Sequence, residues 1–283
     1  MTRPDTIGLV GQGFVGTAVR EGMKNHFIIE TYDKFKDDLS TCTSLRELCA
    51  KSKIVFTCLP TPMRKDGSCD LSILESTIHD INNFNLGNIV VIKSTVVPGT
   101  TQRLNEECDN IDIVFNPEFL TEANYIDDFK NQNRIIIGGP RPATTEIKNM
   151  FRKVFQQTPI VKTGSKTAES VKYFINCFLA TKVSFANEFK QICDAADVDY
   201  DKVVEYALYD KRIGPSHLST PGPDGRRGFG GSCFPKDLNA LIYSAKMNKI
   251  DPCVLESVWK KNLEVRPERD WELLKGRAVS EQD

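Results

Sequence analysis

The first 164 residues alternate between two apolar patterns, and this alternation restricts the fold more than any other feature. Short runs rich in β-branched residues indicate strands, and amphipathic stretches between them indicate helices. Strands separated by helices become parallel neighbours, so we expect an α/β fold with a doubly wound, mostly parallel sheet. The predicted strands are Thr6–Val10, Phe27–Tyr32, Lys53–Leu59, Asn88–Ser94, Ile111–Phe115, Arg134–Gly138 and Pro159–Lys162. The predicted helices are Val15–Lys24, Leu45–Lys51, Leu71–Asn82, Thr100–Glu107 and Thr144–Phe155.

The pattern changes after Gly164. A helical pattern without Pro or Gly runs from Ser165 to about Ala196, and helices dominate the rest of the chain. We therefore expect two domains, residues 1–164 around the sheet and residues 165–283 with a mainly α-helical fold that starts with a long connecting helix.

Composition restricts the class of protein. Hydrophobic residues make up 40% and charged residues 27%, and the net charge of −1 predicts no general attraction to nucleic acid or to an anionic membrane. No apolar run reaches transmembrane length, and Met1–Asp5 leads directly into a predicted strand, which leaves no room for a signal peptide. The nine cysteines are scattered without a Cys-x-x-Cys pair, and the three histidines are isolated. These features predict a cytoplasmic protein with reduced thiols and no metal site.

A glycine-rich turn follows the first predicted strand and opens a predicted helix. It matches G-x-G-x-x-G at Gly11, Gln12, Gly13, Phe14, Val15 and Gly16. In a Rossmann-like fold, such glycines bring the backbone and a helix N-terminus close to a pyrophosphate. Asp33 ends the next strand 22 residues after Gly11, where a carboxylate can accept hydrogen bonds from ribose hydroxyls and favours NAD over NADP. The neighbouring Lys34 would tolerate a phosphate, and a plain glycine turn with a surface aspartate is the alternative.

A second glycine-rich segment carries a thiol. It reads Gly228-Phe229-Gly230-Gly231-Ser232-Cys233-Phe234-Pro235-Lys236-Asp237. Glycines allow the backbone to approach a substrate, and a nearby cation favours the reactive thiolate. A buried core cysteine at a helix start is the simpler interpretation. Together with the dinucleotide pattern, the segment predicts an oxidoreductase that forms a covalent thiol adduct.

Further polar segments follow the predicted strands, where ligands bind in open α/β sheets. They are Thr61-Pro62, Lys93-Ser94-Thr95-Val96 and Asn116-Pro117-Glu118-Phe119-Leu120-Thr121-Glu122. Lys172 and Asn176 lie four residues apart and share one face of the long helix. From residue 6 to about residue 265, the chain resembles the UDP-glucose/GDP-mannose 6-dehydrogenase family, most closely its members that act on UDP-glucose.

The resemblance implies two successive NAD-dependent oxidations of the C6 alcohol of a nucleotide sugar, with UDP-glucose giving UDP-glucuronate. It implies that a thiohemiacetal forms on the cysteine and is oxidised to a thioester. The implied catalytic residues are Cys233 as nucleophile, Lys172 and Asn176 at the oxyanion, Asp237 and Thr95 at the hydrolytic water, and Glu118 as general base.

The resemblance also implies binding residues. Besides the glycine turn, the cofactor contacts would be Asp33, Lys34, Thr61, Pro62, Ser94, Thr95, Glu122 and Lys236. The substrate contacts would be Glu118, Phe119, Leu120, Lys172, Asn176, Arg212, Phe229 and Gly230. Several of these residues have simpler interpretations: Lys172 and Asn176 as a solvated helix face, and Thr95 as a helix cap. Asp237 could pair with Lys236 or cap the helix after Pro235, and Glu118, Glu122 and Arg212 could be surface charges.

Two segments depart from the family pattern. The loop Ser219–Arg227 is longer than in animal relatives, so its contacts with the nucleoside stay open. Typical relatives continue into a C-terminal nucleotide-binding domain, and we expect this chain, which stops at Asp283, to lack it. In relatives the long helix after the dinucleotide domain forms the dimer interface, and Ser165–Ala196 and Asp251–Glu264 carry enough apolar surface to do the same. We therefore predict a homodimer through the long helix, with Trp271 packed on the partner.

Four other functions stay open at this point. The sugar substrate could be GDP-mannose or a UDP-N-acetylhexosamine. A β-hydroxyacid dehydrogenase shares the same plan, although its single oxidation needs no thiol such as Cys233. The last alternative is a non-catalytic, NAD-binding remnant.

Overall fold

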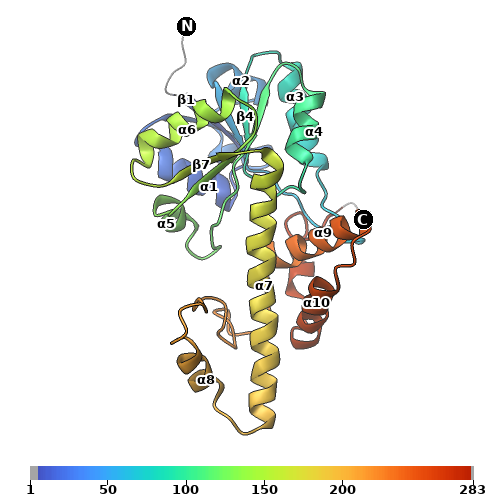
Figure 1. Ribbon diagram of the computed structural model, residues 1–283. Helices are drawn as coiled ribbons and strands as arrows, with labels where there is room; N and C mark the ends of the chain where they lie inside the picture. Colours follow the sequence, from blue (N-terminus) through green and yellow to red (C-terminus); the bar gives the residue numbers. More distant parts are fainter. Residues whose placement is uncertain (1–5, 282–283) are drawn as a thin grey trace. The chain divides into compact units, whose positions relative to one another are not determined.

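The structure is a computed structural model that describes residues 6–281, and the chain divides into two compact units (Figure 1). The first unit contains the chain up to Thr61 and Leu71–Lys172. The second contains Pro62–Asp70 and the chain from Tyr173 onward. The prediction that residues 1–5 leave no room for a signal peptide lies outside the described residues.

The first unit is built on one sheet with the strand order β2-β1-β3-β4-β5-β6-β7. Neighbouring strands are parallel, except that β5 and β6 pair in antiparallel fashion at Phe115 and Gly138. The predicted α/β fold with a mostly parallel, doubly wound sheet is therefore confirmed. The strands are β1 (Thr6–Val10), β2 (Ile28–Tyr32), β3 (Ile54–Thr57), β4 (Ile89–Ile92), β5 (Asp112–Phe115), β6 (Ile135–Gly138) and β7 (Ile160–Thr163).

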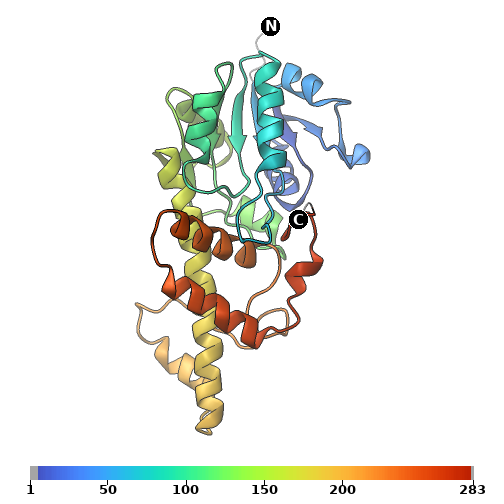
Figure 2. The same cartoon turned by 90° about the vertical axis from the view of Figure 1, so that its right-hand side faces the viewer.

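Helices cover both faces of this sheet (Figures 1 and 2). They are α1 (Phe14–Met23), α2 (Leu45–Lys51), α3 (Ser72–Asn83), α4 (Thr100–Glu107), α5 (Tyr125–Lys130) and α6 (Ala143–Val154), with a short 3₁₀ turn η1 (Asp37–Leu39). All four residues of β4 are buried, which explains why both faces need cover. Ile89 and Val91 belong to the core under α1, α5 and α6. Val90 and Ile92 belong to the core under α2, α3 and α4. A strand buried on both faces has no polar alternation, which explains its continuous apolar sequence.

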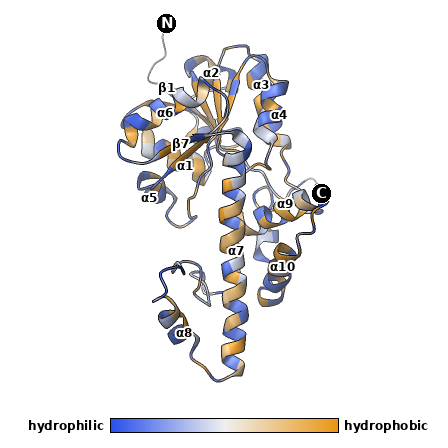
Figure 3. Ribbon diagram, in the orientation of Figure 1, coloured by the Kyte–Doolittle hydropathy of each residue, from blue (hydrophilic) through white to orange (hydrophobic). Residues whose placement is uncertain are grey.

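The second unit is helical. It contains most of the 31-residue helix α7 (Ser165–Ala195), with α8 (Tyr200–Ala207), α9 (Cys233–Met247), α10 (Cys253–Val265) and the 3₁₀ turn η2 (Asp270–Leu273). The hydroxyl of Ser184 on α7 donates to Val258 O on α10 at 3.0 Å, and apolar and polar residues are mixed along α7 (Figure 3). Among residues 6–281, no helix combines the length and the apolarity needed to cross a bilayer. The predicted partner contact of Trp271 is wrong, because its side chain is buried 5.3 Å from the ring of Trp259 in the same chain.

Candidate active site

The glycine turn joins β1 to α1, and two of its three glycines are required for packing whereas the third leaves open space. Gly11 has φ +89°, and a Cβ there would lie 2.5 Å from Cys58 O. A Cβ at Gly16 would lie 2.0 Å from Gly11 O, so both positions need glycine for close packing of strand and helix. At Gly13, by contrast, no described heavy atom beyond its two chain neighbours lies within 4 Å of an added Cβ. The open backbone at Gly13 therefore leaves the space that a pyrophosphate at a helix N-terminus requires.

Asp33 ties the end of β2 to this turn. Its Oδ2 accepts the Gln12 N–H at 2.7 Å, and its Oδ1 accepts the Phe35 N–H at 3.0 Å. Lys36 Nζ donates to Gln12 O at 3.0 Å, whereas Lys34 is exposed. Each carboxylate oxygen has a second lone pair, so Asp33 can still accept a ribose hydroxyl. The turn and Asp33 thus fit an adenine dinucleotide. Phe14 and Val15 form the first turn of α1, where Phe14 packs 5.1 Å from the Tyr125 ring.

The loops after β3 and β4 are linked by side chains that the sequence singled out. Ser94 Oγ accepts the Leu59 N–H at 3.0 Å and donates to Leu59 O at 2.6 Å. Thr61 Oγ1 donates to Thr95 O at 2.8 Å. Thr95 is buried and does not cap α4, whose N-cap residue is Gly99. Pro62 starts the segment assigned to the second unit.

Glu118 and Lys172 form a buried ion pair in the first unit. Lys172 Nζ lies 2.8 Å from Glu118 Oε1 and also donates to Glu118 O at 2.8 Å. The other oxygen of Glu118 accepts the Leu120 N–H at 2.8 Å. Burial raises the pKa of Glu118, but Lys172, the Leu120 N–H and Lys93 together outweigh it and hold the pKa below its usual value. Glu118 is therefore an ionised proton acceptor at neutral pH, and the surface interpretations of both residues are wrong.

Phe119 lies beside this pair. The Arg134 guanidinium lies 4.2 Å from the centroid of the Phe119 ring, and Lys172 Nζ lies 5.7 Å from it. Leu120 is half-buried against the core, whereas Glu122 is exposed. The Asn-Pro-Glu segment therefore directs Glu118 inward and leaves Glu122 at the surface.

Sequence reasoning gave no role to Lys93, although it belongs to the same cluster. Its Nζ donates to Asn116 Oδ1 at 2.9 Å, and Asn116 Nδ2 donates to Ile136 O at 2.7 Å. Burial lowers the pKa of Lys93 to about 8. A lysine that ends an otherwise apolar strand run is the signal that could have revealed this buried cation.

Glu169 was also missed, and it anchors the first turns of α7. It is fully buried, and its carboxylate accepts the Gly99 N–H at 2.6 Å and the Thr101 N–H at 2.8 Å. A carboxylate at the N-terminus of α4 is stabilised by the helix dipole. Glu169 therefore holds α7 against α4 one turn before Lys172.

In the second unit, Cys233 is the first residue of α9 and is partly exposed. The positive end of the helix dipole favours negative charge on its sulfur. Lys236 and Asp237 are joined by a salt bridge, and Asn176 Nδ2 donates to Asp237 Oδ2 at 2.6 Å. Burial lowers the pKa of Lys236, but Asp237, Cys233 and Cys69 together raise it above its usual value. A permanent cation therefore accompanies the thiol in the first turn of α9.

Of the remaining predicted residues, Asn176 and Phe229 are buried, whereas Arg212 lies at the surface. Asn176 is 7% exposed, so the interpretation as a solvated helix face is wrong for Asn176 as for Lys172, at 3%. Phe229 is buried 6.0 Å from the Phe234 ring, and Gly230 is half-buried next to it. Arg212 has a side chain that is 90% exposed and pairs with Asp210, as expected for a surface charge.

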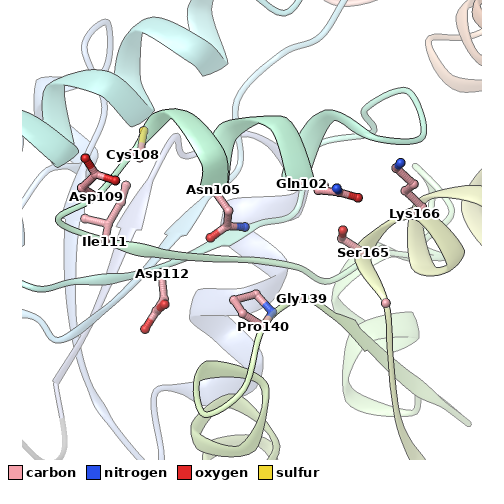
Figure 4. A pocket seen from close by; sticks show the side chains of 11 residues that line it. Gln102, Asn105, Cys108, Asp109, Ile111, Asp112, Gly139, Pro140, Ser165 and Lys166 are labelled. Atoms are coloured by element: carbon pink, nitrogen blue, oxygen red, sulfur yellow. The ribbon is translucent and has the colours of Figure 1, made fainter.

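A pocket of about 660 Å³ opens at another edge of the first unit (Figure 4). It is lined by Asn105 of α4, by Pro140 after β6, and by Ser165 and Lys166 at the start of α7. None of the residues predicted for cofactor, substrate or catalysis lines it. Within the described part of the chain, no group of three His, Cys, Asp or Glu side chains is arranged to hold a metal ion.

Comparison with known sequences gives two family matches. Residues 28–158 match the NAD binding domain of the UDP-glucose/GDP-mannose dehydrogenase family, and residues 166–264 match its central domain. The UDP-glucose 6-dehydrogenase AglM of Haloferax volcanii is 34% identical over 268 residues, which are 88% of this chain and 61% of that protein. The UDP-glucose 6-dehydrogenase TuaD of Bacillus subtilis is 35% identical over 81% of this chain and 51% of its own length. The chain thus spans between half and about three fifths of these relatives.

Solved structures show the same fold. A UDP-glucose dehydrogenase from Pyrobaculum islandicum superposes with a TM-score of 0.83 at 28% identity, over 92% of this chain and 68% of that one. A 3-hydroxyisobutyrate dehydrogenase from Mycobacterium tuberculosis superposes with a TM-score of 0.76 over 94% of each chain, but at 12% identity this is a likeness of fold alone.

Proposed function

Because this chain belongs to the UDP-glucose/GDP-mannose dehydrogenase family and contains its NAD binding and central domains, we propose that it oxidises the C6 alcohol of a nucleotide sugar to a carboxylate. UDP-glucose is the proposed substrate, since relatives at 34% and 37% identity are UDP-glucose 6-dehydrogenases. We assign dinucleotide binding to residues 1–164, and the thiol chemistry and subunit association to residues 165–283.

The single observation that carries this proposal is the first turn of α9. It combines the partly exposed Cys233 with Lys236 and with Asp237, which is bonded to Asn176 at 2.6 Å. NAD, when bound, accepts a hydride in each of the two oxidations. The Cys233 sulfur adds to the carbonyl carbon of the intermediate aldehyde, and the oxygen becomes the hydroxyl of a thiohemiacetal. Its oxidation leaves a thioester, which water cleaves to the carboxylate and the regenerated thiol.

The polar residues on and beside α7 would serve the oxyanion and the water. Lys172 carries an ammonium that stabilises negative charge on O6, and Asn176, one turn later, donates a hydrogen bond. Glu118 is held ionised by Lys172, the Leu120 N–H and Lys93, so we propose that it accepts a proton from the hydrolytic water. Thr95 and Asp237 are proposed to orient that water. We retain the other predicted contacts as proposals: Gly11, Gln12, Gly13, Phe14, Val15, Gly16, Asp33, Lys34, Thr61, Pro62, Ser94, Glu122 and Lys236 for NAD, and Phe119, Leu120, Arg212, Phe229 and Gly230 for the sugar nucleotide.

Counting NADH per sugar consumed tests this proposal. We expect two NADH per UDP-glucose for the natural chain, and loss of the second oxidation for Cys233→Ser. Cys253→Ser is the matched control, because Cys253 also begins a helix, is exposed, and has no assigned role. GDP-mannose and UDP-N-acetylhexosamines are assayed in parallel. Two NADH per molecule with only one of these other sugar nucleotides would show that it, and not UDP-glucose, is the substrate. One NADH per molecule of a 3-hydroxyacid, or no turnover with any of them, would refute the assignment.

We also propose a homodimer through α7 and a cytoplasmic location. Four large apolar side chains on α7 are exposed and recur at intervals of four and seven residues: Phe174, Phe178, Phe185 and Ile192. Such a stripe is typical of a helix–helix interface. None of the nine cysteines forms a disulfide, which supports a reducing compartment such as the cytosol. Sedimentation of the natural chain and of Phe185→Glu tests the dimer, and a natural chain that sediments only as a monomer would exclude it.

A further inference from the structure

The glycine loop before Cys233 is held by a buried asparagine of α10. Asn262 Oδ1 accepts the Phe229 N–H at 2.7 Å, and Asn262 Nδ2 donates to Phe229 O at 2.9 Å. Both backbone groups of Phe229 are therefore paired with one side chain, as they would be with a neighbouring strand. Asn187 of α7 adds a third contact, because its Oδ1 accepts the Gly228 N–H at 3.2 Å.

Arg266 follows α10 and joins three segments of the second unit. Its side chain is 3% exposed. The guanidinium donates two hydrogen bonds to Asp270, from Nε to Oδ1 at 2.6 Å and from Nη2 to Oδ2 at 3.0 Å. Nη2 also donates to Asp224 Oδ2 at 2.8 Å, and Nη1 donates to Arg227 O at 3.4 Å. Only the planar fork of an arginine can meet these acceptors at once.

Two glycines of the loop, Gly228 and Gly230, have no room for a side chain, because Asn262, Arg266 and Asp270 lie against them. A Cβ at Gly228 would lie 2.5 Å from Asn262 Oδ1. A Cβ at Gly230 would lie 2.4 Å from Arg266 Nη2 and 2.6 Å from Asp270 Oδ2. Gly231 has open space around it and φ +68°, and its backbone hydrogen-bonds to Asp270. The guanidinium and its carboxylate therefore contact the loop directly.

The loop Ser219–Arg227 supplies two of the acceptors that Arg266 contacts. It closes as a turn in which Gly222 N donates to Arg226 O at 2.8 Å and Gly225 N donates to Gly222 O at 2.9 Å. At its tip, Asp224 accepts the Arg226 N–H at 3.1 Å and the Arg266 Nη2. This loop thus provides a carboxylate, that of Asp224, for Arg266.

We infer that Arg266, clamped between Asp224 and Asp270, is a positioning residue that sets the backbone of Phe229–Gly231 and thereby the placement of the Cys233 sulfur. The side chain of Ser232, the N-cap residue of α9, makes no cap hydrogen bond to this helix. The path of the glycine loop therefore decides how the chain begins this helix. The inference rests on the proposed function only for its catalytic consequence; the clamp itself is tested without any substrate.

The test compares Arg266→Lys, which keeps the charge but loses the fork, with Arg269→Lys. Arg269 is exposed on the same segment and pairs only with Glu272 among the described residues, at 3.6 Å. In Arg266→Lys, we expect hydrogen exchange of the Phe229 and Gly231 amides to quicken by about tenfold or more, because the opening of this loop becomes easier. Alkylation of Cys233 by iodoacetamide, followed by peptide mass spectrometry, should quicken by about threefold. With UDP-glucose and NAD, kcat should fall by about tenfold, and by a larger factor than KM rises.

Unchanged exchange and alkylation in a folded Arg266→Lys would overturn the inference. If that variant does not fold, Asp224→Asn decides by the same two measurements, since Asp224 is 48% exposed and its loss removes one arm of the clamp. If the clamp acts as inferred, hydrogen exchange of the loop also quickens in Asp224→Asn. Unchanged exchange in that variant would refute the inference. Both measurements need neither NAD nor sugar, so an absence of turnover would count against the proposed function and not against the clamp.

Discussion

Substituting the glycines of the dinucleotide turn one at a time separates packing from cofactor binding. Gly16→Ala places a Cβ 2.0 Å from Gly11 O, and Gly11 is itself fixed by its N–H to Tyr32 O at 2.9 Å. Alanine is favoured over glycine inside a helix by about 1 kcal/mol, but overpacking against atoms that cannot move costs about 1–3 kcal/mol. Because the contact is so short, the Cβ is fixed by the helix backbone and Gly11 O belongs to the main chain, we expect a net loss of about 2 kcal/mol in the free energy of unfolding.

Gly13→Ala is the matched variant. Gly13 has φ −80°, which alanine adopts easily, and no described heavy atom beyond its two chain neighbours lies within 4 Å of an added Cβ. Replacing this N-cap glycine should cost at most about 1 kcal/mol of stability. Its methyl group would occupy the space through which the backbone approaches the pyrophosphate, so we expect NAD affinity to fall by about tenfold, or about 1.4 kcal/mol.

Urea unfolding and calorimetric titration with NAD measure both quantities. The prediction is a crossed result, in which Gly16→Ala is less stable and Gly13→Ala binds NAD more weakly at nearly natural stability. Equal stability of the two variants, or natural NAD affinity in Gly13→Ala, would refute the assignment of packing to one glycine and cofactor approach to the other.

Two further predictions concern the buried charges of the first unit. Lys172→Met leaves the Glu118 carboxylate buried without its ammonium, so the free energy of unfolding should fall by about 3–5 kcal/mol, and the double variant with Glu118→Gln should recover part of it. A double variant as unstable as Lys172→Met in urea would contradict this. Burial lowers the pKa of Lys93 from 10.5 to about 8, so the unfolded chain binds more protons between these pH values and stability should rise with pH across that window. The rise should approach about 3 kcal/mol and be missing in Lys93→Met, and parallel urea curves for both proteins would disprove it.

Several parts of the candidate site follow from local pattern. The spacing of Lys172 and Asn176 predicted one shared helix face, and both side chains are buried on α7. Polar residues after apolar runs predicted the loops beyond β3, β4 and β5, and the glycine turn between β1 and α1 is where the pattern put it. These predictions succeeded because helix and strand periodicity depend on neighbouring residues and little else. The helix α5, only six residues long, was too short to show such a period.

Other features depend on residues that meet across long stretches of chain. Arg266 and Asp224 are 42 residues apart in the sequence and form a hydrogen bond at 2.8 Å. No local sequence pattern near either residue predicts this contact. Glycines 228 and 230 suggested access for a substrate, whereas their packing partners are Asn262 and Arg266. A glycine in a sequence shows that space is needed but not what fills it.

The chain's own pattern was thus sufficient for the strands of the first unit and its α-helices except α5, for the dinucleotide turn, and for the helix that carries the lysine and asparagine. Periodicity and turn chemistry are local, which is why these features could be predicted. The ionised state of Glu118, the lowered pKa of Lys93 and the clamp on the thiol loop emerged once the chain was folded. Charge states and hydrogen-bond partners depend on burial and on distances between remote residues, which no stretch of sequence contains.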